Sequence, residues 1–171
     1  MSAAQSGQVL NALSVDVEDW FQVSAFEHVI DRGSWERLEC RVERNMRVLL
    51  GLFGRRGVKA TFFPLGWIAE RYPATLRAAH AAGHEIASHG YAHRLVSSLT
   101  AEEFAADLLR TKRVLEAAAP GAEVRGFRAP SFSFTRGTPW AFDVLRAQGY
   151  AYSSSVFPVT HDRYGIPDFP R

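Results

Sequence analysis

The chain has 171 residues, of which 47% are hydrophobic and 22% are charged, which suits one globular domain that buries a core. Its net charge of +2 is small and its basic residues are scattered, so a surface for binding nucleic acid is not expected. The single cysteine, Cys40, excludes an internal disulfide and a cysteine-rich zinc site, and its place among helix formers indicates a structural residue.

The beginning of the chain carries no targeting signal that we recognise. Residues 1–10 are predicted to be a flexible lead-in, and residues 11–171 are predicted to form the domain. The lead-in is small and polar, without the basic start and apolar run of a signal peptide. No window is apolar and long enough to span a bilayer. We therefore expect no membrane span and a cytoplasmic location.

Short β-rich runs alternate with helical patterns along most of the chain. Strands are predicted at 12–16, 58–64, 84–88, 124–127 and 150–154, and helices at 35–53, 67–82, 100–119 and 138–148. Residues 21–33 read as an irregular loop with a helical turn over the strand ends. This alternation predicts a parallel α/β sheet or barrel. Because a complete (β/α)8 barrel needs about 250 residues, the chain is either an open sheet or an incomplete barrel.

Local signals mark several helix ends. Ser34 is predicted to cap the first helix at its N-terminus, and Gly54 and Gly57 are predicted to supply its stop. Thr100 followed by Glu103 forms a capping box, with a hydroxyl at the cap and a carboxylate three residues later.

Two histidines follow the predicted strand at 84–88. His89 and His93 are four residues apart, so their rings lie on one side if the intervening residues make a helical turn. Neutral imidazoles placed in this way suit Zn²⁺ or a similar metal. The alternative is a pair of ordinary loop histidines. His84, at the opposite end of the same strand, is interpreted as structural.

Three carboxylates follow the first predicted strand. Asp16, Glu18 and Asp19 lie within four residues and repel one another unless a cation or a water separates them. A metal needing an oxygen ligand and a water needing a base would account for two of them. The alternative is an acidic loop that faces solvent, although the aromatic Trp20 directly afterwards indicates a partly covered place.

Arg128, Ala129 and Pro130 follow the fourth predicted strand. An arginine at this position could orient a carboxylate in bidentate fashion, or it could be an ordinary exposed arginine. The run 153–155 is interpreted as small polar residues at a strand end. Several aromatic residues could line a sugar-binding groove or belong to the core: Trp20, Trp67, Phe132 and Trp140.

Four motifs, in this order, resemble those of the polysaccharide deacetylase family, also called the NodB homology domain or carbohydrate esterase family 4. They are Leu-Ser-Val-Asp at 13–16, Lys-Ala-Thr-Phe-Phe at 59–63, Ala-Gly-His-Glu-Ile-Ala-Ser-His at 82–89 and Arg-Ala-Pro at 128–130. The resemblance covers about residues 13–158. The sequence at 16–23 and the Tyr-Gly-Ile-Pro-Asp at 164–168 are similar to sequences of the family branch associated with exosortase loci and exopolysaccharide production.

This resemblance implies a distorted (β/α)7-type barrel and a metal-dependent hydrolase. It implies that Asp16 is the catalytic base, that His89 and His93 bind the metal, and that Arg128 holds the base. The implied reaction removes N-acetyl groups from amino sugars of a polysaccharide or oligosaccharide. A divalent metal, zinc with cobalt or nickel as alternatives, polarises the acetyl carbonyl and binds the attacking water, whose proton Asp16 takes. Pro130 and Trp20 are expected to contact the substrate.

The chain departs from the family pattern near the expected metal ligands. Val17 follows Asp16, where the family has a second, metal-binding aspartate. Glu18 or Asp19 is therefore expected to supply that ligand. Glu18 is preferred because it lies two residues after the base, and both remain candidates. Gly90 stands where the family usually has serine or threonine, so a supporting hydrogen bond is expected to be missing.

The family's general-acid histidine lies in a late Leu-x-His motif, and no such motif follows Arg128. The later His161 has the context Val-Thr-His-Asp, which does not match. The chain is accordingly expected to be the N-terminal part of a longer enzyme, without its last strands. Such a truncated barrel exposes strand edges and apolar surface, which predicts self-association or marginal stability.

Two other functions remain open at this point. One is hydrolysis of a small cyclic or linear amide such as a ureide. The other is a carbohydrate-binding or interaction module on a degenerate barrel that has no catalytic activity.

Overall fold

The computed structural model describes residues 11–162 and 164–170, so the predicted lead-in at 1–10 lies outside the described residues. The strands are β1 (Ser14–Val17), β2 (Thr61–Pro64), β3 (Glu85–Ile86), β4 (Gly126–Phe127) and β5 (Tyr152–Ser153). The α-helices are α1 (Val42–Arg56), α2 (Gly66–Arg71), α3 (Pro73–Ala81), α4 (Ala101–Ala118) and α5 (Trp140–Ala147). Short 3-10 helices are η1 (Trp20–Gln22), η2 (Ser24–Phe26), η3 (Arg32–Arg37), η4 (Val96–Ser98) and η5 (Pro130–Phe132).

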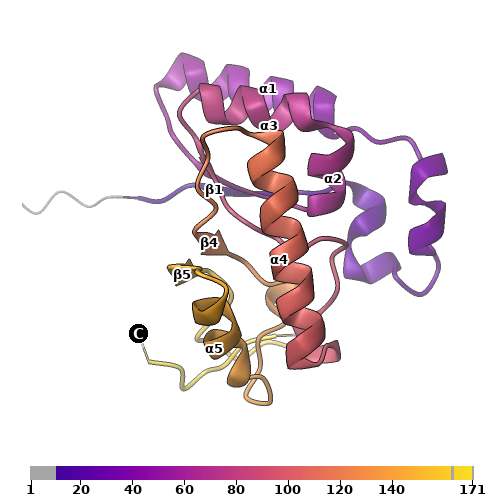
Figure 1. Ribbon diagram of the computed structural model, residues 1–171, viewed down its shortest axis with the longest axis vertical. Coiled ribbons are helices and arrows are strands. Elements are labelled where there is room, and N and C mark those ends of the chain that lie inside the picture. Colours follow the sequence, from indigo (N-terminus) through magenta and orange to yellow (C-terminus); the bar gives the residue numbers. More distant parts are fainter. Residues whose placement is uncertain (1–10, 163, 171) are drawn as a thin grey trace, which may run out of the picture.

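The strands follow one another in chain order, and every pairing is parallel. β1, β2 and β3 form one sheet, and β4 pairs with β5 in another. A parallel bridge between Ser88 and Phe127 connects the two sheets. Figure 1 shows α1 and α3 beside each other at one end, α4 along one side and α5 near β4 and β5. The predicted α/β class is confirmed, and successive parallel strands with helices outside them are the arrangement of a barrel wall.

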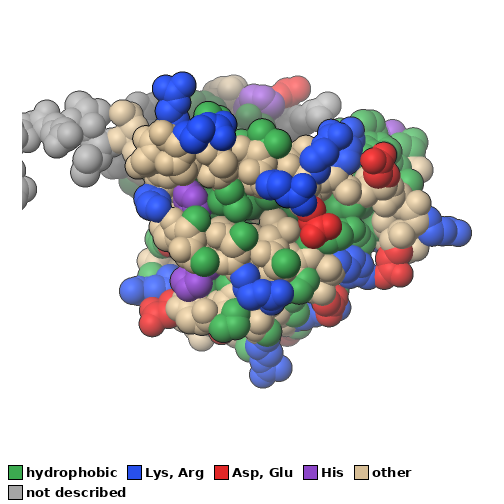
Figure 2. Space-filling model, turned by 90° about the horizontal axis from the view of Figure 1, so that it is seen from above, with side chains coloured by type: hydrophobic (Ala, Val, Ile, Leu, Met, Phe, Trp, Pro, Cys, Tyr) green, Lys and Arg blue, Asp and Glu red, His purple; other side chains and the backbone are tan. Residues whose placement is uncertain are grey.

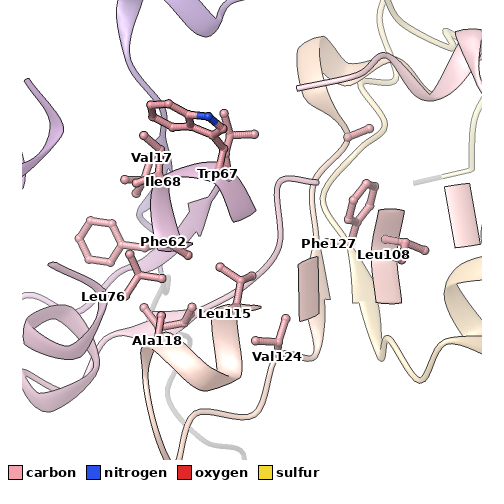
Figure 3. Close-up of a cluster of buried hydrophobic side chains, with 14 of the residues drawn as sticks. Val17, Phe62, Trp67, Ile68, Leu76, Leu108, Leu115, Ala118, Val124 and Phe127 are labelled. Carbon is pink, nitrogen blue, oxygen red and sulfur yellow. The ribbon is translucent and has the colours of Figure 1, made fainter. Parts of the chain in front are cut away.

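The hydrophobic core lies between the strands and the surrounding helices (Figure 3). Val17 from β1 and Phe62 from β2 are buried against Ile68 of α2. Leu115 of α4 and Phe127 of β4 extend the same cluster toward the second sheet. This packing fixes the strands relative to one another and therefore fixes the loops that leave their C-terminal ends.

The first predicted helix, at 35–53, is wrong in its N-terminal part. Residues Arg32–Arg37 form η3 instead, because Asp31 caps that turn by accepting a hydrogen bond from the Gly33 amide at 2.6 Å. α1 begins only at Val42, so Ser34 does not cap it, and the Ser34 hydroxyl donates to the carbonyl of Asp31. Of the two predicted stop residues, Gly57 is confirmed, since it ends α1 with φ of +63°, whereas Gly54 lies inside the helix.

The second predicted helix, at 67–82, consists of two helices that meet at Tyr72. Pro73 has no amide hydrogen and disfavours helical geometry in the residue before it, so Tyr72 adopts φ of −124° and ψ of 50°. The capping box of α4 is confirmed. The Glu103 amide donates to the Thr100 hydroxyl at 3.2 Å, and the Thr100 amide donates to the Glu103 carboxylate at 2.9 Å.

The surface carries charges of both signs. Figure 2 looks onto the end of the molecule where α1 lies and shows Lys and Arg side chains spread among hydrophobic and acidic ones. Within the described ranges, no helix combines the length and the apolar character that crossing a membrane requires.

Candidate metal centre

The predicted site residues lie at the C-terminal ends of the parallel strands or in the loops that follow them. Asp16 lies in β1, and Glu18 is the first residue after that strand. His89 follows β3, and Arg128 follows β4. Parallel strands present their C-terminal ends on the same side of a sheet. Residues far apart in the sequence are thereby brought to one place.

Glu18, His89 and His93 form a compact group of possible metal ligands. The Glu18 Oε2 atom lies 3.0 Å from His93 Nε2 and 3.9 Å from His89 Nε2. The three ligand atoms are all within 4.8 Å of one another, and the two imidazole rings are 5.3 Å apart. Both histidines are buried, whereas Glu18 is partly open to solvent. Three side chains thus converge on one buried point, while the rest of the Glu18 side chain is partly exposed.

Each histidine is held through its other ring nitrogen. His89 Nδ1 lies 2.8 Å from the carbonyl oxygen of Arg128, and a carbonyl can only accept, so Nδ1 carries the proton. His93 Nδ1 lies 3.3 Å from the Ser24 hydroxyl. Both rings therefore turn Nε2 toward Glu18. Zinc-binding histidines are arranged in the same way, with one ring nitrogen bound to the metal and the other hydrogen-bonded to the protein.

The charge states of the cluster suit a cation. Burial by itself would raise the pKa of Glu18, but the imidazoles of His93 and His89 outweigh this effect and hold the pKa below its usual value. Burial lowers the pKa of His89, although the nearby Asp16 carboxylate acts in the opposite direction. An ionised carboxylate and a neutral imidazole are the forms that bind metal.

One atom in the cluster lacks a hydrogen-bond partner. Glu18 Oε2 is buried and makes no hydrogen bond of acceptable geometry, despite its proximity to the two ring nitrogens. Buried polar atoms without a partner are rare in native structures. A divalent cation between this oxygen and the two Nε2 atoms would satisfy it, and two imidazoles with one carboxylate is a donor set typical of zinc sites. The residues present therefore fit the expected metal.

The loop between the two histidines differs from the expected helical turn. Gly90 has φ of +75° and His93 has φ of +52°, both in the left-handed region. The rings nevertheless meet because this loop is fixed against α2. The Gly66 amide donates to the Gly90 carbonyl at 2.9 Å, and the Trp67 amide donates to the Tyr91 carbonyl at 3.0 Å.

Asp19 is not part of the cluster. Its buried carboxylate accepts hydrogen bonds from the amides of Trp20, at 2.8 Å, and Arg41. The Arg41 side chain adds an ion pair at 3.8 Å. The chain leaves β1 and enters η1 at this residue, and the side chain of Asp19 caps that turn. Of the two acidic candidates for the third ligand, the structure brings only Glu18 to the histidines.

Asp16 is held by Arg128, but not through the expected two-nitrogen fork. Arg128 Nη1 donates to Asp16 Oδ1 at 2.6 Å. Its Nη2 donates to the hydroxyls of Ser14, at 2.7 Å, and Ser154, at 3.0 Å, while Nε donates to the Ser154 carbonyl at 3.3 Å. The guanidinium also lies 4.2 Å from the centre of the Phe63 ring. Arg128 thus connects β1 with the end of β5 and fixes one oxygen of Asp16.

The two expected substrate contacts lie in different environments. Trp20 is 41% exposed and packs edge-on against Phe26, with the Arg41 guanidinium 5.7 Å from its ring. Pro130 is buried at the start of η5. Contact of either residue with a substrate stays a prediction. His84 is buried away from the cluster, where its Nδ1 accepts a hydrogen bond from the Ala60 amide at 3.1 Å.

Several residues around the site were not identified from the sequence. Ser154 binds Arg128, and Ser155 accepts a hydrogen bond from the Ala129 amide at 2.9 Å. Their position at the end of a strand was the available signal. Asp107 of α4 accepts a hydrogen bond from the Tyr91 amide at 3.1 Å, and Ser24 contacts His93. These last two lie in segments without a motif, so no local pattern could have found them.

Successive parallel strands with helices outside them place this protein in the class of α/β, barrel-type folds. A candidate metal centre of two histidines and one carboxylate lies at the C-terminal edge of its strands. The particular family follows from sequence comparison. The sequence model described as "Polysaccharide deacetylase" matches residues 30–153, and the chain belongs to this family.

Individual relatives agree with this assignment. The chain is 32% identical over 108 residues to a chitooligosaccharide deacetylase of Sinorhizobium fredii, covering 63% of this chain and 47% of the relative. The structure of a candidate polysaccharide deacetylase from Mycobacterium smegmatis superposes with a TM-score of 0.69 at 28% identity, covering 85% of this chain and 50% of the other.

A pseudoenzyme of carbohydrate esterase family 4 from Bacillus anthracis has the same fold, with a TM-score of 0.61 at 21% identity, covering 83% of this chain and 41% of the other. The chain thus spans about half the length of the relatives that it matches.

Proposed function

We propose that this protein hydrolyses N-acetyl groups on amino sugars of an oligosaccharide or polysaccharide, using a divalent metal held by Glu18, His89 and His93. The observation that carries the proposal is the convergence of these three ligand atoms within 4.8 Å. Asp16, which pairs with Arg128, lies close enough to His89 for its carboxylate to oppose the lowering of the His89 pKa by burial. Zinc suits this donor set best, and cobalt and nickel are the alternatives.

The chemistry needs a Lewis acid and a base, and the chain offers a place for each. When bound, a divalent metal supplies electrophilic stabilisation at the acetyl carbonyl and makes water more acidic. Asp16 accepts the proton of the attacking water. Arg128 orients Asp16 through a charge-assisted hydrogen bond, and its backbone carbonyl orients His89. Base and ligand are thus positioned by the same residue.

Relatives support an acetylated amino sugar as the substrate, because one of them is a chitooligosaccharide deacetylase. The similarity of residues 16–23 to the exosortase-associated branch extends the proposal to an exopolysaccharide.

Acetate release from an N-acetylglucosamine oligomer tests the proposal directly. We expect activity that chelation abolishes and zinc restores. Asp16→Asn should lower the rate at least 10²-fold while leaving bound zinc unchanged, since loss of a general base has effects of about 10²–10⁴-fold. Asp143→Asn is the matched control, because this exposed aspartate of α5 pairs with Arg146 of the same helix. Full activity of Asp16→Asn, or ammonia and ring-opened products from a ureide in place of acetate, would contradict the proposal.

A carbohydrate-binding role without catalysis is the second candidate. His161 stacks on Tyr164 at 3.9 Å and pairs with Asp162 in the C-terminal segment. A pseudoenzyme shares the fold, so the fold alone does not establish turnover. This role predicts glycan binding that survives both chelation and Asp16→Asn, with no release of acetate.

A further inference from the structure

We propose that Ser24 is a positioning residue for His93: its hydroxyl fixes the ring so that Nε2 faces the metal position. This inference rests on the proposed metal centre, which supplies the reason for orienting the ring. Ser24 is the first residue of η2, and it is separated from His93 by 69 residues of sequence. Its role is therefore a product of the fold.

The hydrogen-bond directions around Ser24 form one consistent chain. The hydroxyl lies 3.3 Å from His93 Nδ1 and 2.8 Å from the Ser131 hydroxyl. With Nε2 directed at Glu18 as a metal ligand, the proton of neutral His93 is on Nδ1. Nδ1 then donates to Ser24, and the Ser24 hydroxyl is free to donate to Ser131. The opposite direction would place the proton on Nε2 and block the ligand atom.

The backbone of His93 is held in an unfavourable conformation. Its φ of +52° lies in the left-handed region, which is unfavourable for a residue with a side chain and persists where the surroundings impose it. Arg32 fixes the neighbouring backbone by donating to the Ala92 carbonyl at 3.0 Å. That contact does not set the rotation of the His93 ring, whereas the Ser24 hydroxyl contacts the ring itself.

Position 90 does not offer an alternative support. Gly90 has no side chain, and a Cβ there would lie 3.2 Å from Asp107 Oδ2. Its φ of +75° adds strain for any other residue. The Asp107 carboxylate instead accepts the amide of Tyr91. A hydroxyl that supports His93 therefore has to come from another segment. The sequence predicted that a supporting hydrogen bond would be missing at Gly90. The Ser24 hydroxyl supplies a hydrogen bond to His93 from a different segment.

The two histidines differ in a way that makes the inference testable. His89 is held by the Arg128 carbonyl, which no side-chain substitution removes. His93 is held by a hydroxyl that a single substitution deletes. Ser131, the hydrogen-bond partner of Ser24, lies in the loop after β4 and has φ of +50°. The Ser24–Ser131 contact thus links the loops after β1 and β4 to the histidine that follows β3.

The affinity of the full chain for Zn²⁺, measured by competition with a chromophoric chelator, tests the role of Ser24. We expect Ser24→Ala to raise the dissociation constant 10- to 100-fold, the range typical for loss of a hydrogen bond to a metal-binding histidine. Ser24→Thr keeps a hydroxyl and should remain within a few-fold of wild type. Ser34→Ala is the matched control, because its hydroxyl donates to the Asp31 carbonyl, in a turn remote in sequence from both histidines.

An unchanged constant for Ser24→Ala would overturn the inference, and so would an equal loss in Ser24→Thr, since the hydroxyl would then not be the cause. A wrong assignment of the metal centre itself can be distinguished from a wrong role for Ser24. In the first case His93→Ala would also leave zinc binding unchanged, whereas in the second case His93→Ala would weaken it. A second measurement avoids variants altogether. In the zinc-loaded wild type, ¹⁵N chemical shifts of the His93 ring should show a proton on Nδ1 and metal on Nε2, and the reverse assignment would refute the arrangement.

Discussion

Glu18 and Asp19 are adjacent acidic residues for which the structure predicts opposite behaviour. Glu18→Gln removes a ligand charge from the metal position and keeps the size of the side chain. We expect zinc affinity to fall by more than about 100-fold, beyond the effect of losing a hydrogen bond to a metal-binding histidine. The stability of the metal-free chain should change by less than about 1 kcal/mol, since glutamine has nearly the same shape and most such changes are small.

Asp19→Asn should weaken the fold and leave the metal site intact. The Asp19 carboxylate caps η1 and accepts the amides of Trp20 and Arg41. Asparagine retains one acceptor oxygen but presents an NH₂ group where the second amide needs an acceptor. Loss of a cap is worth about 0.5–2 kcal/mol, and a hydrogen bond to a charged group about 1.5–3 kcal/mol. We therefore expect a loss of about 1–3 kcal/mol, or a melting temperature lower by roughly 2–10 °C.

Unfolding with and without zinc separates the two effects. At a free zinc concentration 100 times the dissociation constant, binding stabilises the folded state by about 2.7 kcal/mol. A 100-fold weaker Glu18→Gln variant would gain only about 0.4 kcal/mol at the same concentration. Asp19→Asn should still gain about 2.7 kcal/mol from its lower starting point. If Asp19→Asn loses the zinc-dependent gain and Glu18→Gln keeps it, our assignment of the third ligand is wrong.

Three further outcomes are expected. Arg128→Lys should reduce acetate release at least about 10-fold, because lysine cannot span the same acceptors. Zinc affinity should not change, because the backbone carbonyl that holds His89 remains. An equal loss of zinc affinity would argue against separate roles for the side chain and the carbonyl. Thr100→Ala should lower the unfolding free energy by about 1 kcal/mol in urea through loss of the capping box, and an unchanged midpoint would contradict this. Burial and then Lys59 lower the pKa of His84, so below pH 6.5 the unfolded chain takes up protons that the folded chain resists, and stability falls as pH falls. His84→Gln should show a shallower decline, and an identical pH profile would exclude His84 as the cause.

The strand and helix pattern was largely predictable from the sequence because apolar periodicity and capping residues are local signals. The main errors were also local. The helix at 67–82 contains Pro73, whose effect on Tyr72 is a sequence rule that the periodicity concealed. At 35–53, the helical spacing of apolar residues continued across η3, where Asp31 stabilises a tighter turn. In both cases a backbone constraint prevailed over the hydrophobic pattern.

The choice between Glu18 and Asp19 follows from strand geometry. Side chains alternate between the two faces of a strand, so Asp16 and Glu18 share one face while Val17 points into the core, where it is buried. Asp19 would lie with Val17 if the strand continued, but the chain turns there and the carboxylate caps η1. The two-residue spacing was therefore a physical reason to prefer Glu18.

Arg128 shows what a sequence motif leaves out. Its side chain binds Asp16, which the motif implied, whereas its carbonyl binds His89, which any residue at this position could do. The backbone contact depends on the bridge between Ser88 and Phe127, which sets the register of the two sheets. The orientation of His89, a proposed ligand, is consequently a property of sheet register, and the orientation of Asp16, the proposed base, is a property of one side chain. Substitutions of Arg128 should alter the base alone, whereas changes that shift the register should alter both.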